Sequence, residues 1–287
     1  MAVSANTNTS ALVALSSLRD NNLNLDRISK ALQTGFRVAD ATDDGAIFMV
    51  AQGVRGDVKA YAAVQSSLSA AIGLGQVTMA ALDKIYGLVG DIKAKITSLA
   101  DGSLTGQQQD IYRGDIRAFI GQINNFIAQA DYNGKNLLAG DARAAPLSFV
   151  ADVSGTTLSF STAHQLDWDS DQFLGPNVLF PDATDVDENI GENPPDTATA
   201  FAGLASFESR LLEMTMAVSA QTRSFEQQKA FVDNLVDAMK KGLGVLVDSD
   251  VAGAGAALES ARVAQQLNLQ ALSIANQQPS VLLGLLR

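Results

Sequence analysis

The 287-residue chain contains no cysteine, a single histidine and a single tryptophan. Without cysteine there is no disulfide, no thiol nucleophile and no thiolate ligand for a metal ion. The one histidine, His164, has no second residue beside it with which a catalytic constellation can be assembled. Residues 1–20 also lack a basic segment followed by an apolar core, so we expect no cleaved secretory signal. We expect no enzymatic activity and no cofactor.

Positive charge is missing from one long segment. Eleven acidic residues and no Lys or Arg lie between Arg143 and Arg210, whereas acids and bases balance on each side of it, so this segment carries the whole net charge of −11. Binding to nucleic acid or to an anionic membrane needs a basic surface. We therefore expect neither partner, and we expect the acidic segment to face solvent.

Three aspartates within that segment, Asp167, Asp169 and Asp171, resemble the start of a calcium-binding loop. An EF-hand loop then requires Gly at its sixth position and Glu at its twelfth, where this chain has Gln172 and Val178. We expect a solvated acidic loop here and no metal site.

Hydrophobic residues at alternating spacings of four and three dominate the middle of the chain. One such series runs from Val64 to Leu99 and a second from Leu204 to Met239. Series of this kind are typical of helices that pack as coiled coils. The second predicts a helix over about 198–246, and Tyr112, Ile116, Phe119, Ile123, Phe126 and Ala130 predict a shorter helix over about 107–130. The expected fold is mainly α, a rod-like antiparallel helical bundle.

Turn residues and short apolar runs predict a small insertion between these helices. The sequence DYNGKNLLAG, residues 131–140, contains an Asn-Gly turn that ends the helical region. Residues 147–151 and 157–161 flank Ser154-Gly155 and predict a β-hairpin. We expect residues 146–197 to form a short, acidic outer insertion that contains β-structure.

The two ends of the chain, residues 4–37 and 250–287, carry few charges and have helical periodicity. Residues 263–286 hold no charge but seven amide side chains, which would be costly in a lipid-spanning helix. Heptad positions at the N-terminal end are Ala11, Leu15, Leu18, Asn22, Leu25, Ser29 and Leu32, and small or polar residues at the C-terminal end are Ala257, Ala261, Ala264, Asn268, Ala271 and Ala275. We expect these ends to pair as coiled-coil helices, with Asn22 fixing their register, and to be buried against further neighbours.

Three segments of the chain have the pattern of one known family. They are ISKALQTGFRVADATDDGA at residues 28–46, DYNGKNLLAG at residues 131–140, and the whole segment from Leu246 to Arg287 with its terminal apolar run. On these residues the chain resembles bacterial flagellin. The short middle of the chain is most similar to the compact flagellins of alphaproteobacteria.

This resemblance implies a structural subunit that polymerises into the flagellar filament used for swimming. It implies export in an unfolded state through the flagellar type III apparatus, and an extracellular location. The implied partners are other flagellin subunits, the export apparatus, an export chaperone, and junction and cap proteins. The expected regions are a core helix at 1–37, bundle segments at 38–145 and 198–249, the insertion at 146–197, and a second core helix at 250–287.

The resemblance and the heptads together assign candidate residues to the polymerisation interface. These are Leu15, Leu18, Asn22, Leu25, Leu32, Arg37, Asp43, Asp44, Ala261, Ala264, Asn268, Ala271, Leu272, Ala275, Leu285, Leu286 and Arg287. For Asp43 and Asp44 two roles stay open, which are capping of the following helix and contact with bases such as Arg37 or Arg55 of another subunit.

Two other functions remain as alternatives. A hook-filament junction protein shares the terminal helices but occurs in few copies. A surface adhesin related to flagellin needs an aromatic groove, for which Trp168, Phe173 and Phe180 are the candidates.

Overall fold

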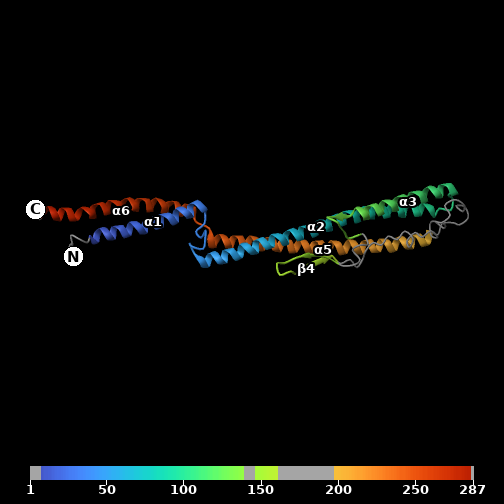
Figure 1. Cartoon of the computed structure of the whole chain (residues 1–287). Coiled ribbons are helices and arrows are strands. Elements are labelled where there is room, and N and C mark those ends of the chain that lie inside the picture. Colours follow the sequence, from blue (N-terminus) through green and yellow to red (C-terminus); the bar gives the residue numbers. More distant parts are fainter. Residues whose placement is uncertain (1–7, 139–145, 161–196, 286–287) are drawn as a thin grey trace. The chain divides into compact units, whose positions relative to one another are not determined.

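The computed structural model describes residues 8–138, 146–160 and 197–285. Within these ranges the chain forms five helices and two small hairpins (Figure 1). The helices are α1 (Thr9–Thr34), α2 (Gly45–Leu99), α3 (Gly106–Gln129), α5 (Thr197–Val247) and α6 (Val251–Leu285); the strands are β1 (Asp131–Tyr132), β2 (Lys135–Asn136), β3 (Leu147–Val150) and β4 (Thr157–Phe160). The predicted fold class, a helical bundle with a small β-containing insertion, is confirmed. His164, the three aspartates at 167–171 and the proposed aromatic groove lie outside the described residues.

The chain divides into two compact units. One comprises residues 1–59 and 236–287, and the other comprises residues 60–235. Each unit is therefore described by itself.

The second unit is built on the seam between α2 and α5. Every heptad position of α2 from Val64 to Leu99 is buried, and so are most of those predicted for α5. The two helices run antiparallel, because Gln65 Nε2 donates to Asp233 Oδ1 at 2.7 Å while Lys93 Nζ lies 3.2 Å from Glu208 Oε2. The heptad prediction thus located the core of this unit, since apolar residues at this spacing form one continuous face on a helix.

Helix α3 begins at a capping box and packs beside α2. Thr105 Oγ1 accepts a hydrogen bond from the amide of Gln108, whose side chain accepts one from the amide of Thr105, so two amides at the start of α3 are paired. Lys95 Nζ lies 2.6 Å from Asp115 Oδ2 and joins α2 to α3. The apolar face of α3 is buried at Ile116, Ile120 and Ile123.

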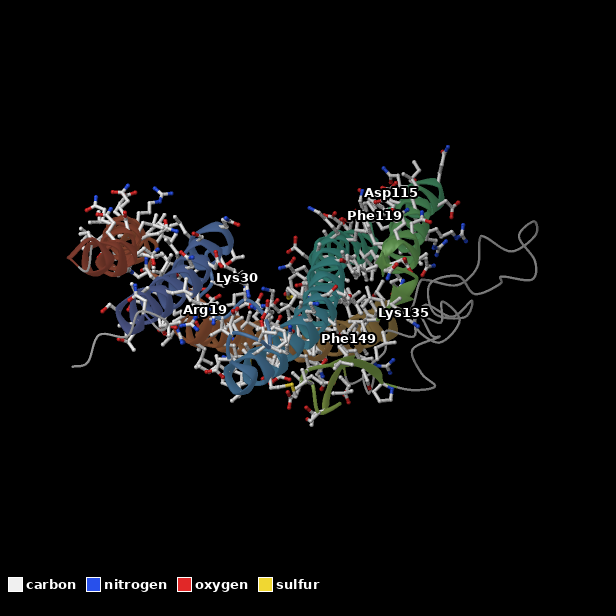
Figure 2. The ribbon with its side chains drawn as sticks, turned by 60° about the vertical axis from the view of Figure 1, so that its left-hand side comes forward. Arg19, Lys30, Asp115, Phe119, Lys135 and Phe149 are labelled. Carbon is white, nitrogen blue, oxygen red and sulfur yellow. The ribbon has the colours of Figure 1, made fainter. Side chains whose placement is uncertain are left out.

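The two hairpins follow α3 in the chain. Asn133 and Gly134 connect β1 to β2 with φ angles of 54° and 74°, as a two-residue hairpin turn requires. The predicted β3–β4 hairpin is also present, with Leu147 opposite Phe160. It docks on the helical seam through Phe149 (Figure 2) and Phe160, whose rings lie 5.7 and 4.9 Å from the ring of Phe225 on α5.

Candidate functional site

Helices α1 and α6 of the first unit lie side by side in antiparallel orientation (Figure 1). Two polar contacts between them run from an asparagine side chain to a main-chain carbonyl. Asn8 Nδ2 donates to the carbonyl of Ala275 at 2.7 Å, and Asn21 Nδ2 donates to the carbonyl of Ala261 at 2.9 Å. Alanine at the two accepting positions lets the opposite backbone come close, so these small residues explain how asparagine reaches a main-chain oxygen.

The paired terminal helices bury little of their apolar surface against each other. Helix α1 has no buried residue at all. In α6 only Leu258, Ala261 and Ala275 are buried among the side chains described. The apolar residues left largely exposed are Leu12, Val13, Leu15 and Leu23 on α1 and Val251, Val263, Leu267, Leu269 and Ile274 on α6. Exposed apolar surface on this scale is typical of an interaction site.

Two short connectors link the terminal helices to α2 and α5, and they are hydrogen-bonded to each other. The amide of Arg37 donates to the carbonyl of Val247 at 2.7 Å, and the amide of Ser249 donates to the carbonyl of Gly35 at 2.9 Å. Gly35 ends α1 with a φ of 73°, a left-handed conformation that favours glycine. We call this pairing of residues 35–38 with residues 246–249 the connector clasp.

A small hydrophobic core supports the connector clasp. Val38, Ala51 and Val247 are almost fully buried there, and Ile47, Phe48, Leu243 and Leu246 pack against them. The core therefore brings together the first connector, the start of α2 and the end of α5.

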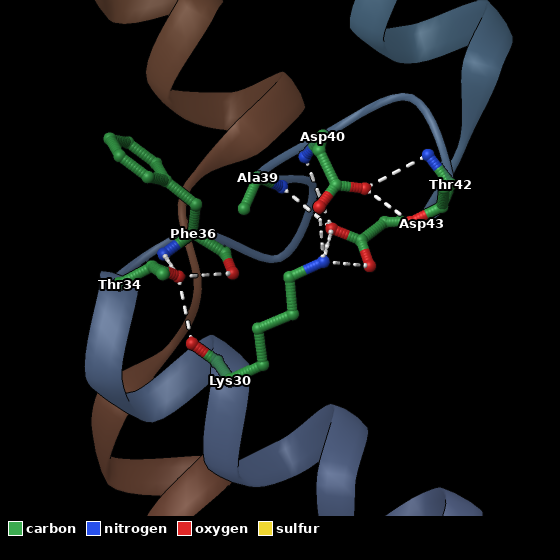
Figure 3. A network of polar contacts seen from close by, with 7 residues as sticks. All are labelled: Lys30, Thr34, Phe36, Ala39, Asp40, Thr42 and Asp43. Carbon is green, nitrogen blue, oxygen red and sulfur yellow. Dashed lines mark hydrogen bonds and ion pairs between the residues drawn. The ribbon is translucent and has the colours of Figure 1, made fainter.

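A charged network fixes the loop that follows the clasp (Figure 3). Lys30 Nζ on α1 lies 2.6 Å from Asp40 Oδ2 and 2.8 Å from Asp43 Oδ1. Asp43 Oδ2 also accepts hydrogen bonds from the amides of Ala39 and Asp40, and Asp40 Oδ1 accepts one from the amide of Thr42. The Lys30 ammonium holds the pKa of Asp40 and of Asp43 below the usual value, and the two carboxylates raise the pKa of Lys30. The loop is thus held by paired charges at neutral pH.

The structure assigns partners within the chain to the charged candidate residues. Asp44 Oδ1 accepts hydrogen bonds from the amides of Ala46 and Ile47, so the expected capping of the next helix is confirmed for Asp44. Asp43 pairs with Lys30, whereas Arg37 Nη2 donates to the carbonyl of Leu246. Arg55, the other base considered for these acids, lies over the ring of Phe36 at 5.7 Å.

The apolar candidates divide between the contact with the opposite helix and the exposed surface. Half-buried or buried are Leu18, Leu25, Leu32, Ala261, Ala264, Asn268, Leu272 and Ala275, whereas Leu15, Asn22 and Ala271 are exposed. Leu285 ends α6, and Leu286 and Arg287 lie outside the described residues.

The predicted frame of the terminal heptads needs a correction. The residue of α1 that is half-buried and bonds to the backbone of α6 is Asn21. Asn22 is exposed, and its side-chain oxygen accepts a hydrogen bond from Gln265 Nε2 at 2.8 Å. On α6 the buried contact uses Leu258 where the sequence frame used Ala257. Apolar residues surround most of both helices, so the sequence pattern does not single out the face that meets the partner helix.

Some residues of this site were not found from the sequence. Lys30 is a single base near the end of α1, Val38 lies in a connector too short to show periodicity, and Val247 is the last residue of α5. Their partners are about 10 and 200 residues away, as with Lys30 and Asp40 or Val38 and Val247. Only their placement in space reveals them.

Within the described ranges, no helix is long and apolar enough to cross a membrane, and no group of His, Cys, Asp and Glu could hold a metal ion. What these parts of the chain do contain are two antiparallel helical seams. One of them is formed by terminal helices with exposed apolar side chains. These features define the class, an α-helical coiled-coil protein with its two ends paired and suited to self-association.

Comparison with known proteins identifies the family. A sequence model of the bacterial flagellin N-terminal helical region matches residues 5–143. The chain is 33% identical over 286 residues to a flagellin of Brucella melitensis, covering 98% of each chain. It is 32% identical to flagellin FljK of Caulobacter vibrioides, covering 99% of this chain and 98% of that one. The chain belongs to the bacterial flagellin family and is a structural subunit of the flagellar filament.

A solved structure from Vibrio parahaemolyticus, described as a flagellar hook-associated protein, has a similar fold. Its TM-score is 0.56 at 13% identity, and the match covers 71% of this chain and 99% of that one. Likeness at this identity concerns the fold alone. Relatives that match along the whole chain are flagellins, so the junction-protein and adhesin alternatives are not favoured.

Proposed function

We propose that α1 and α6 form the polymerisation interface of this flagellin, through which each subunit buries its terminal apolar surface against other copies. The observation that carries the proposal is the exposure of large apolar residues on this pair. Leu23, Leu267 and Ile274 are 61%, 58% and 64% exposed in the single chain. Complete burial of a fully exposed side chain of this size contributes roughly 1.5–3 kcal/mol, so burying the exposed parts of the many apolar side chains on this pair favours association.

The charged candidates are proposed to contribute at the edge of this interface. Arg37 uses one nitrogen of its guanidinium group on the carbonyl of Leu246, and the side chain is exposed. The remaining donors are available to a carboxylate of another subunit. Asp43 and Asp44 already hold the connector loop and the start of α2, so their proposed role is to present this loop in a fixed shape to a neighbouring copy.

The wider context follows from family membership and is proposed on that ground. The subunit is exported through the flagellar type III apparatus with the help of a chaperone, joins the filament between junction and cap proteins, and functions outside the cell. Its role is structural and not enzymatic. The acidic segment, residues 146–197, carries most of the net negative charge of the chain and is proposed to face solvent.

Seeded polymerisation tests the proposed interface. Purified full-length protein is mixed with sheared filament fragments at neutral pH and imaged by negative-stain electron microscopy. Long uniform filaments are expected, and a chain without residues 250–287 is expected to stay monomeric. Filaments formed by that truncated chain would overturn the proposal.

Single substitutions give a sharper test than the truncation. Leu15→Ser and Leu267→Ser change exposed residues of the terminal pair, and Leu212→Ser changes an equally exposed leucine on α5 (45%, 58% and 47% exposed). All three should leave the helix content of the monomer unchanged, because none of these side chains is buried. We expect the first two to raise the critical concentration for polymerisation and the third to leave it unchanged. Equal effects of all three would show that the interface is not confined to α1 and α6.

A further inference from the structure

Regular heptads do not by themselves fix the register of α5 on α2. A heptad repeat looks almost the same after a shift of seven residues, which moves one helix along the other by about 10 Å. From Leu82 to Leu99 every heptad position of α2 is apolar and branched. Such a face can be packed in more than one register, and something else must select the native one.

One layer of this seam differs from the rest. Gly75 of α2 is buried and lies directly against Thr222 of α5, which is 2% exposed. A Cβ atom built on Gly75 would lie 2.1 Å from Thr222 Oγ1 and 3.2 Å from both Thr222 Cβ and Cγ2. No side chain fits at position 75 while threonine occupies position 222, so the backbone of α2 and the side chain of Thr222 fill one another's space.

The hydroxyl group of Thr222 lacks the hydrogen bond that threonine commonly makes in a helix. Threonine in a helix often donates to the carbonyl four residues earlier, as buried Thr78 does to Leu74 and half-buried Thr215 does to Leu211, at 2.8 and 2.7 Å. Thr222 Oγ1 is fully buried and has no hydrogen-bond partner in the described part of the chain. An unpaired buried hydroxyl costs free energy, so the presence of Thr222 in this largely apolar seam calls for a compensating role.

A second glycine marks the same level of α2. A Cβ on Gly73 would lie 2.8 Å from the ring of Tyr132, on the strand that follows α3. Tyr132 of β1 therefore lies against the backbone of α2 at Gly73, and Thr222 of α5 lies against it at Gly75. Most other helical glycines of α2, such as Gly87, have open space around the same position.

We propose that Gly75 and Thr222 act as a register pair that admits one alignment of α5 on α2. In the native alignment, the threonine side chain fills the space left by the glycine. A shift by one heptad in either direction brings Thr222 against Leu68 or Leu82, both fully buried and without such space. The pair thus converts a repetitive seam into one with a single register. Filament subunits must be superimposable on one another, and this pair gives every copy the same alignment.

A double-mutant cycle on the full-length monomer tests the close fit, independently of polymerisation. Gly75→Ala is expected to lower the thermal midpoint by roughly 5 °C, because the added methyl overpacks the layer. The control Gly87→Ala, on the same helix but in open space, is expected to raise it by roughly 3 °C, because alanine favours helix. Adding Thr222→Ala to Gly75→Ala should remove the loss. A Gly75→Ala variant that behaves like the control, or a loss that persists with alanine at 222, would overturn the proposal.

Cross-linking reads the register itself, since the chain has no cysteine of its own. Met79→Cys with Ser219→Cys reports the native alignment, in which Ser219 Oγ and Met79 Sδ lie 3.3 Å apart. Met79→Cys with Leu212→Cys or with Glu226→Cys reports a shift of one heptad in either direction. A short bifunctional thiol reagent should link only the first pair in the native seam.

Replacing the register pair by leucine makes its layer like those around it. In Gly75→Leu/Thr222→Leu chains with native helix content we expect a shifted pair to be linked as well. Linking that stays confined to positions 79 and 219 would show that the register is set elsewhere. If the leucine variant does not fold, the Gly75→Ala/Thr222→Ala chain takes its place in the same cross-linking assay, and linking confined to positions 79 and 219 again shows that the register is set elsewhere.

Discussion

Val247→Ala should loosen the connector clasp by a predictable amount. Val247 is 1% exposed, and its side chain packs with Val38 and Ala51. Removing two buried methyl groups costs about 1.6 kcal/mol of transfer free energy, and the cavity left behind raises the cost to about 2 kcal/mol. At 1.4 kcal/mol for each factor of ten, the open form of the clasp becomes roughly 30-fold more populated.

Native-state amide hydrogen exchange measures this opening at the affected bonds. The amides of Arg37 and Val38 both donate to the carbonyl of Val247, which the substitution retains. Their protection should fall roughly 30-fold in Val247→Ala. Val245→Ala, two residues earlier on α5 where the side chain is 83% exposed, is the control and should change protection little. Equal protection in the two variants would refute the buried core of the clasp, and unprotected amides in the unmodified chain would show that the monomer lacks the clasp altogether.

Two further predictions concern the hairpin and the charged loop. Phe160→Ala empties the aromatic contact beneath the β3–β4 hairpin and should lower unfolding free energy by about 4 kcal/mol in urea titrations, whereas Val153→Ala, 46% exposed on the same hairpin, should cost little. Asp40 and Asp43 have lowered pKa values in the folded chain, so the stabilisation by Lys30 is complete above the ordinary aspartate pKa of 3.8 and is lost as pH falls through the folded values beneath it. The Asp40 amide donates to Asp43 Oδ2, so its protection should fall in strong acid, and Lys30→Met should move that fall to higher pH; a pH profile unchanged by Lys30→Met would contradict this assignment.

The central helices illustrate what a strong pattern can establish. The series from Val64 to Leu99 predicted the buried face of α2 residue by residue, because a helix of 3.6 residues per turn places such a series on one side. The predicted bounds of 107–130 and 198–246 differ from α3 and α5 by one residue at each end. The turn at Asn133-Gly134 was predictable for a different reason, since few residue pairs tolerate its left-handed backbone.

The terminal helices show where the same reasoning stops. Their apolar residues cover more than one face, so Leu15 and Asn22 looked as suitable for the seam as Ala14 and Asn21, which the structure places there. A single sequence does not separate the face that meets the partner helix from the face left for other subunits.

By itself the sequence determined that this protein is a mainly helical, cysteine-free chain with two coiled-coil seams, an acidic middle and ends of flagellin type. These properties follow from local periodicity, composition and motif, which need no knowledge of distant contacts. Only the tertiary structure decided the frame of α1 on α6, the pairing of the connectors, the partners of Lys30 and the contact of Gly75 with Thr222. Each of these joins residues far apart in the chain or on separate elements, and the free energy that selects them arises from packing and hydrogen bonds formed only when the chain is folded.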